Sequence, residues 1–185
     1  MWRLCFRQQT RVKVQSASTD RTKDLLEVIH SDVCGPMRSP TFGGMKFFVT
    51  LIDDKSQHCA VYLMRNKSEV FSKFAHFVNM AENKTDSRIK VLRSDNGGEY
   101  KSAKFVRFCA DRGIIQKFTP PYTPKLNGVA ERMNRTLVEC ARCMLEHASL
   151  AKEYWGEAVM TAAFLRNGLN SVSYTHLRAH ETRGN

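Results

Sequence analysis

The chain has 185 residues, of which 42% are hydrophobic and 10% aromatic, enough for one folded domain and unlike an intrinsically disordered chain. Lys and Arg number 29 against 18 Asp and Glu, a formal net charge of +11 that favours a polyanionic partner, although a merely soluble basic surface has the same composition. No apolar run is long enough for a membrane span or a signal peptide, so we expect neither membrane insertion nor secretion.

The first segment, residues 1–23, is predicted to be a flexible basic linker. It carries six basic side chains against one acid, is rich in Gln, Ser and Thr, and has no clear periodicity. The six cysteines of the chain are scattered through ordinary sequence. This usage is typical of reduced thiols in the cytosol or nucleus, not of a disulfide framework.

Three strands joined by short connections are predicted next. The segments with a strand pattern are 25–32, 46–53 and 58–64, and turn-forming residues separate them. Short connections of this kind predict an antiparallel meander.

The hydrophobic period then changes to that of helices. Asn66 and Glu69 mark the start of a helix that reaches about residue 82. The later predicted elements are a strand at 89–95, a helix at 102–112 stopped by Gly113, a strand at 114–118, and helices at 127–148 and 152–167. Three strands followed by strand–helix alternation predict an α/β domain with a mixed five-stranded sheet flanked by helices.

Residues 171–185 do not continue this pattern. They resemble translated cloning-linker sequence, so we predict a tail at 169–185 that is not native to the fold, and a folded core at 24–168.

Three acids stand where metal chemistry would need them. Asp32 closes the first strand, Asp95 opens a turn after the fourth, and Glu131 lies in a helix with thirty-five residues between it and Asp95. Each acid alone has a simpler structural interpretation: Asp32 as a turn former, Asp95 as an Asx-turn residue and Glu131 as a solvated helix residue. Together they predict a cage for hard divalent cations, which prefer oxygen ligands.

The helix that holds Glu131 has an apolar and a polar face. At 100° per residue its apolar stripe comprises Val129, Met133, Leu137, Cys140 and Met144. Glu131 points roughly opposite, and the polar residues near it are Asn127, Asn134, Arg135 and Arg142. Helical geometry leaves two options for this polar face: bulk water, or a cleft shared with cations suited to phosphates.

Three ordered motifs carry a family resemblance. HSDVCGP at 30–36, SDNGGEY at 94–100 and PKLNGVAERMNRT at 124–136 resemble the integrase core of copia-type long-terminal-repeat retrotransposons, over about residues 24–168. The resemblance implies a ribonuclease-H-like fold in which Asp32, Asp95 and Glu131 are the catalytic residues and ligate Mg²⁺ or Mn²⁺, as two ions. Asp53, Asp54 and Glu99 do not match the ligand positions.

The resemblance also implies a reaction and partners. The 3′ end of the element's DNA is trimmed, and the new 3′-hydroxyl attacks a phosphodiester of target DNA; positioning and charge neutralisation are the main needs of such a transfer. The implied partners are element ends, target DNA and further copies of the chain, and the implied location is the nucleus together with cytoplasmic particles. The predicted DNA-binding residues are Lys125, Asn127, Arg132, Asn134, Arg135 and Arg142.

Two departures keep alternatives open. Cys5 resembles the last ligand of an upstream zinc module whose other ligands the chain lacks, and Lys125 and Leu126 stand where the family usually has two glutamines. One alternative is a catalytically inactive, basic nucleic-acid-binding remnant of such an element. The other is a ribonuclease-H-like nuclease of another class, which the acid spacing disfavours.

Overall fold

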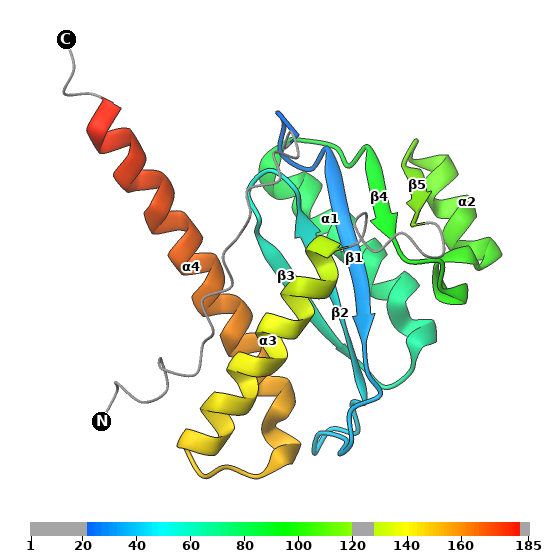
Figure 1. Cartoon of the computed structure of the whole chain (residues 1–185). Helices are drawn as coiled ribbons and strands as arrows, with labels where there is room; N and C mark the ends of the chain where they lie inside the picture. Colours follow the sequence, from blue (N-terminus) through cyan, green and yellow to red (C-terminus); the bar gives the residue numbers. More distant parts are fainter. Residues whose placement is uncertain (1–21, 120–127, 182–185) are drawn as a thin grey trace.

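The fold is built on one mixed sheet. The computed structural model describes residues 22–119 and 128–181, with side chains described as far as residue 169. Its strands are β1 Val28–Cys34, β2 Phe47–Asp53, β3 Cys59–Met64, β4 Val91–Ser94 and β5 Ile115–Phe118, in the spatial order β3-β2-β1-β4-β5. The first three strands pair antiparallel, whereas β4 and β5 run parallel to β1. This is the ribonuclease-H-like arrangement (Figure 1).

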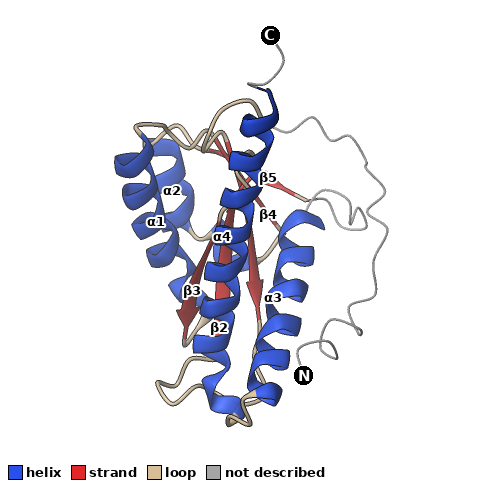
Figure 2. Cartoon of the chain, turned by 90° about the vertical axis from the view of Figure 1, so that its left-hand side faces the viewer, coloured by secondary structure: helices blue, strands red, loops and turns tan. Residues whose placement is uncertain are grey.

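The helices cover both faces of the sheet. They are α1 Val70–Thr85, α2 Ala103–Asp111, α3 Gly128–His147 and α4 Trp155–Glu181, with short 3-10 turns η2 Lys67–Glu69, η3 Gly98–Lys101 and η4 Lys152–Tyr154. Figure 2 shows α1 and α2 on one side of the sheet and α3 and α4 on the other. No helix in the described ranges is both long and apolar enough to span a membrane.

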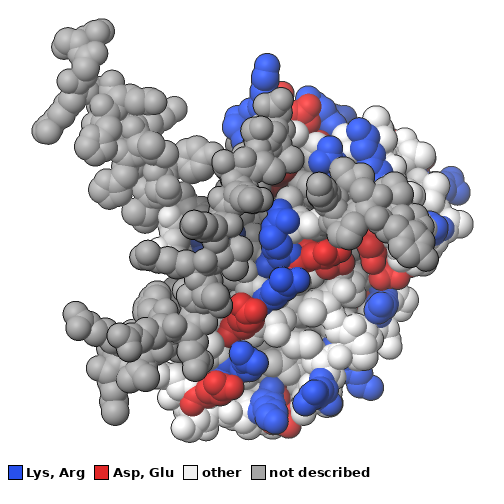
Figure 3. Space-filling view, in the orientation of Figure 1, with Lys and Arg blue, Asp and Glu red and all other residues white. Residues whose placement is uncertain are grey.

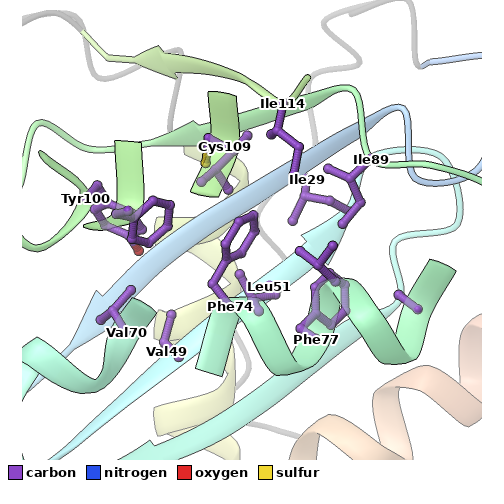
Figure 4. Close-up of a cluster of buried hydrophobic side chains, with 14 of the residues drawn as sticks. Ile29, Val49, Leu51, Val70, Phe74, Phe77, Ile89, Tyr100, Cys109 and Ile114 are labelled. Carbon is purple, nitrogen blue, oxygen red and sulfur yellow. The ribbon is translucent and has the colours of Figure 1, made fainter. Parts of the chain in front are cut away.

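Each face of the sheet has its own hydrophobic core. Alternate residues of β2 point to opposite faces: Val49 and Leu51 join the core under α1 and α2, and Phe48 and Ile52 join the core under α3 and α4. The first core is drawn in Figure 4, where Phe74 of α1 packs among residues of β1, β2 and α2. Burial on both faces explains why β2 is almost continuously apolar.

Several local signals act as predicted. The backbone N–H of Asn66 donates to the carboxylate of Glu69 at 2.9 Å, which satisfies a free donor at the helix start. The hydroxyl of Ser102 accepts the N–H of Phe105 at the start of α2, and Gly113 after its end takes the left-handed φ of +70°.

Both predicted boundaries of the first strand were wrong. The strand predicted at 25–32 begins only at Val28, because Leu26 has a left-handed φ of 61°, and it continues to Cys34, paired with Phe48 of β2. Asp32 therefore lies within the strand and not at its end. The interpretation of residues 169–185 as a tail that is not native to the fold stays a prediction.

The last helix also continues past its predicted end at residue 167, to Glu181. The side-chain amide of Asn167 does not stop the helix; it pairs with the edge of the sheet. Its oxygen accepts the N–H of Cys59 and its nitrogen donates to the carbonyl of Cys59, both at 2.9 Å. Asn167 therefore ties α4 to edge strand β3.

Candidate active site

The site centres on Asp32 in β1. Because β1 and β4 are parallel and pair His30 with Arg93, extending that register by two residues sets Asp32 level with Asp95. Asp32 is half-buried, and its pKa is raised to about 6, first by burial and then by the charge of Asp95. The charge of Glu131 adds to this rise, while a hydrogen bond from Asn134 opposes it. The charges of Asp95 and Glu131 therefore both act on Asp32.

Asp95 directly follows β4 and makes the turn that its sequence allows. Its Oδ1 accepts the N–H of Gly97 at 3.2 Å, the geometry of an Asx turn. A Cβ atom added to Gly97 would lie 3.0 Å from this Oδ1 and 2.8 Å from Oε2 of Glu99. A side chain at position 97 would therefore push against both carboxylates. The Asx turn uses only one oxygen of Asp95, so its structural and its chemical interpretation are compatible.

Glu131 lies in the first turn of α3, and its side chain is exposed. The segment before it, with the predicted DNA-binding residues Lys125 and Asn127, lies outside the described residues. Within the described ranges, no three His, Cys, Asp or Glu side chains gather closely enough to hold one metal ion. Asp32 and Asp95 thus form the centre of the site, with Glu131 at its rim.

The donor set suits a hard cation that keeps part of its own coordination shell. Magnesium is usually held by one or two carboxylates, with waters and substrate phosphates in the other positions. Asp32 and Asp95 supply such carboxylates, and a bound divalent ion would offset the charge of Asp95, which adds to the effect of burial in raising the pKa of Asp32. These two residues suit a hard cation, but the predicted cage of all three acids is not formed among the described residues.

Asn134 contradicts its predicted place on the exposed polar face. It is only 5% exposed, its Nδ2 donates to Oδ2 of Asp32 at 2.9 Å, and its Oδ1 accepts from the hydroxyl of Thr50 at 2.9 Å. The face of α3 turned to the sheet comprises Gly128, Ala130, Met133, Asn134, Leu137 and Ala141. Val129, Cys140 and Met144, predicted in the stripe, are half-buried beside it.

The sequence did contain a signal for this rotation. Ala130, Leu137 and Ala141 recur at helical spacing with Met133 and Asn134 between them, which is one face of a helix. Two alanines in place of large apolar residues indicate a face that lies close to the sheet. Thr50, the partner of Asn134 on β2, carried no signal of its own.

The other predicted DNA-binding residues on α3 are at the surface. Arg132, Arg135 and Arg142 are exposed, and Arg142 lies 3.9 Å from Glu146 one turn on. Figure 3 shows Lys and Arg alternating with Asp and Glu over this side of the molecule. Among the described residues on this side, the basic side chains therefore border the acids and do not form a uniform positive patch.

Asp53 and Asp54, two of the other acids that the sequence offered, have structural roles. Asp53 accepts the N–H of Leu26 and caps the turn at Ser56. Asp54 accepts from Thr22 and lies 2.9 Å from Nε2 of the buried His30. Burial alone would raise the pKa of Asp54, but these hydrogen bonds outweigh it and hold the pKa below its usual value.

Comparisons with known proteins point to one family. A family model described as "Integrase core domain" matches residues 5–124, a range that contains Asp32 and Asp95 and stops before Glu131. The chain is 49% identical over 167 residues to the "Retrovirus-related Pol polyprotein from transposon TNT 1-94" of Nicotiana tabacum, covering 90% of the chain and 12% of that protein. It is 34% identical over 166 residues to the transposon RE2 polyprotein of Arabidopsis thaliana, covering 89% of the chain and 11% of that protein.

A solved structure shows the same fold at lower sequence similarity. It is a simian T-cell lymphotropic virus intasome in complex with the PP2A regulatory subunit B56 gamma, with a TM-score of 0.62 and 20% identity, covering 78% of this chain and 49% of that one.

The chain spans about one eighth of the length of the Nicotiana tabacum relative. It belongs to the integrase core domain family, in the form found in the Pol polyproteins of plant retrotransposons.

Proposed function

We propose that this chain is the catalytic core of a retrotransposon integrase, a divalent-metal-dependent polynucleotidyl transferase that processes element 3′ ends and joins them to target DNA. The observation that carries the proposal is the meeting of Asp32 and Asp95 on neighbouring parallel strands, with Glu131 close enough to act on the same carboxylate. Family membership and the thirty-five-residue spacing support it.

Each acid has a role in this proposal. Asp32 and Asp95 would hold Mg²⁺ or Mn²⁺, as two ions, and Glu131 would complete the coordination from the rim. When bound, such ions lower the pKa of an attacking hydroxyl and neutralise charge on the transferring phosphate. The chain itself orients the DNA backbone with Arg132, Arg135 and Arg142, which are exposed.

The proposed partners are element ends and target DNA, with further copies of the chain in a multimer. The proposed location is the nucleus, reached by way of cytoplasmic particles. These proposals rest on the family and on the net charge of +11.

A chimera provides the test. This chain would replace the matching segment in the integrase region of the Nicotiana tabacum relative, and joining of a labelled element end to plasmid DNA would be measured with Mg²⁺ and Mn²⁺. Metal-dependent joining is expected. A chimera that binds DNA but joins no ends, beside an active tobacco parent, would replace the enzyme proposal with that of a nucleic-acid-binding remnant.

A further inference from the structure

A buried polar network connects α3 to the sheet beside Asp32. Thr50 of β2 is the direct cross-strand neighbour of Asp32, so the two side chains point to the same face. Thr50 is fully buried, and Asn134 of α3 lies between it and the carboxylate. The network thus contains one residue from each of β1, β2 and α3.

The carboxylate determines which way the Asn134 amide is oriented. Its NH₂ group donates to Oδ2 of Asp32, and its oxygen accepts the hydroxyl proton of Thr50. The reverse orientation would place two acceptors, the amide oxygen and the carboxylate, against each other. The Thr50 hydroxyl can donate or accept, and by donating to the amide oxygen it stabilises the orientation that the carboxylate selects.

The same contact places Glu131. Asn134 follows Glu131 by three residues, so both lie on neighbouring parts of the α3 surface. A hydrogen bond that fixes Asn134 against β1 and β2 also fixes how far α3 is rotated and shifted along its axis. The distance of Glu131 from Asp32 depends on that rotation.

We infer that Asn134, held by Thr50, is a positioning residue: it orients the Asp32 carboxylate toward the metal and sets the approach of Glu131. The inference rests on the proposed function and replaces the predicted contact of Asn134 with DNA. Partners of ligating carboxylates commonly change metal affinity or activity by about 10–100-fold when they are removed.

The test measures Mn²⁺ binding by the whole chain, from the electron paramagnetic resonance signal of free Mn²⁺, together with thermal unfolding. Asn134→Leu keeps the branched shape but removes both hydrogen bonds, and Thr50→Val replaces only the hydroxyl by a methyl group. We expect Mn²⁺ affinity to fall about 10–100-fold in Asn134→Leu and less in Thr50→Val. Thr50→Ser restores the hydroxyl and is expected to bind Mn²⁺ as the wild type does.

Thr41→Val is the matched control. Thr41 is also a buried threonine, and its hydroxyl accepts the N–H of Met45 in a loop outside the network. This variant is expected to lose thermal stability without losing Mn²⁺ affinity. If Asn134 had a purely structural role, Asn134→Leu would likewise lose thermal stability and keep its Mn²⁺ affinity. Wild-type Mn²⁺ affinity in Asn134→Leu would therefore overturn the inference. Should Asn134→Leu fail to fold, wild-type affinity in Thr50→Val would overturn it instead.

The remaining outcomes separate the two proposals. If the wild-type chain binds Mn²⁺ and Asn134→Leu does not, while the chimera joins no DNA, the positioning role is supported and the catalytic function is ruled out. A wild-type chain that binds no Mn²⁺ at millimolar concentration overturns the positioning role, since Asp32 then holds no metal to be positioned for.

Discussion

The hydroxyl groups of Ser31 and Tyr100 lie 2.7 Å apart in the core of the protein. Both residues are fully buried, and each is next to a part of the candidate site: Ser31 precedes Asp32, and Tyr100 lies in the 3-10 turn that follows Asp95. Ser31 points to the α1 and α2 face, opposite to Asp32. This hydrogen bond therefore connects the segments that carry the two central acids from behind the sheet.

Removing that bond should cost stability. Tyr100→Phe leaves the buried Ser31 hydroxyl without a partner, so we expect the free energy of unfolding to fall by about 1–3 kcal/mol. Ser31→Ala combined with Tyr100→Phe should cost less than the sum of the single variants, as urea unfolding in a double-mutant cycle would measure. Tyr154→Phe, at an exposed site, is the control. Strictly additive losses would show that the two hydroxyls do not interact.

The raised pKa of Asp32 predicts how stability without metal depends on pH. Its folded pKa of about 6 lies above the unfolded value of 3.8, so the folded state binds the proton more tightly. The contribution of Asp32 to stability is therefore complete below pH 3.8 and is lost as pH rises through 6. Asp32→Asn, which stays neutral, should be more stable than the wild type at pH 8 by on the order of 1–2 kcal/mol.

Urea unfolding in EDTA at pH 4 and pH 8 would check this prediction. The difference between variant and wild type should be small at pH 4 and should grow toward pH 8. Other titrating groups, such as His30 with its lowered pKa, are common to both proteins and do not affect the difference. If Asp32→Asn were more stable than the wild type by the same amount at both pH values, the charge of Asp32 would not be the cause of the difference.

Asp95→Asn should separate fold from chemistry. An Asn side chain can still accept the Gly97 N–H, so the turn is retained, but the charge that a cation needs is gone. We expect the variant to unfold at a temperature close to the wild type, to bind DNA, and to lose metal-dependent joining in the chimera. Full activity with Mg²⁺ or Mn²⁺ would mean that Asp95 is not a ligand.

DNA binding should depend steeply on salt and little on sequence, because phosphate contacts release counterions. Removing Arg132 or Arg135 by substitution with Ala should weaken binding and reduce the slope of log affinity against log salt by about 1 each. Arg142→Ala should change the slope less, since Arg142 lies beside Glu146. Fluorescence anisotropy between 50 and 200 mM salt, roughly the range over which such affinities collapse, is the measurement. Affinity that is insensitive to salt would contradict this interface.

Local patterns were enough to predict most elements, because their causes lie within a few residues of each other. The apolar run of β2, the Asn66–Glu69 start of α1 and the stop at Gly113 all appear where the sequence indicated them. The order of strands and helices then predicted the mixed five-stranded sheet flanked by helices, and the family resemblance implied its ribonuclease-H-like form. The spacing of Asp95 and Glu131 pointed to the family, which the comparisons confirmed.

Only the tertiary structure decided how the pieces face one another. The rotation of α3 depends on how closely its alanines let it approach the sheet, and a periodicity based on large apolar residues misplaced it. That rotation buries Asn134 and brings it to Asp32 and Thr50, residues more than eighty positions away in the sequence. A hydrogen bond across such a separation has no local signature, because its partners meet only after the sheet and the helix have packed.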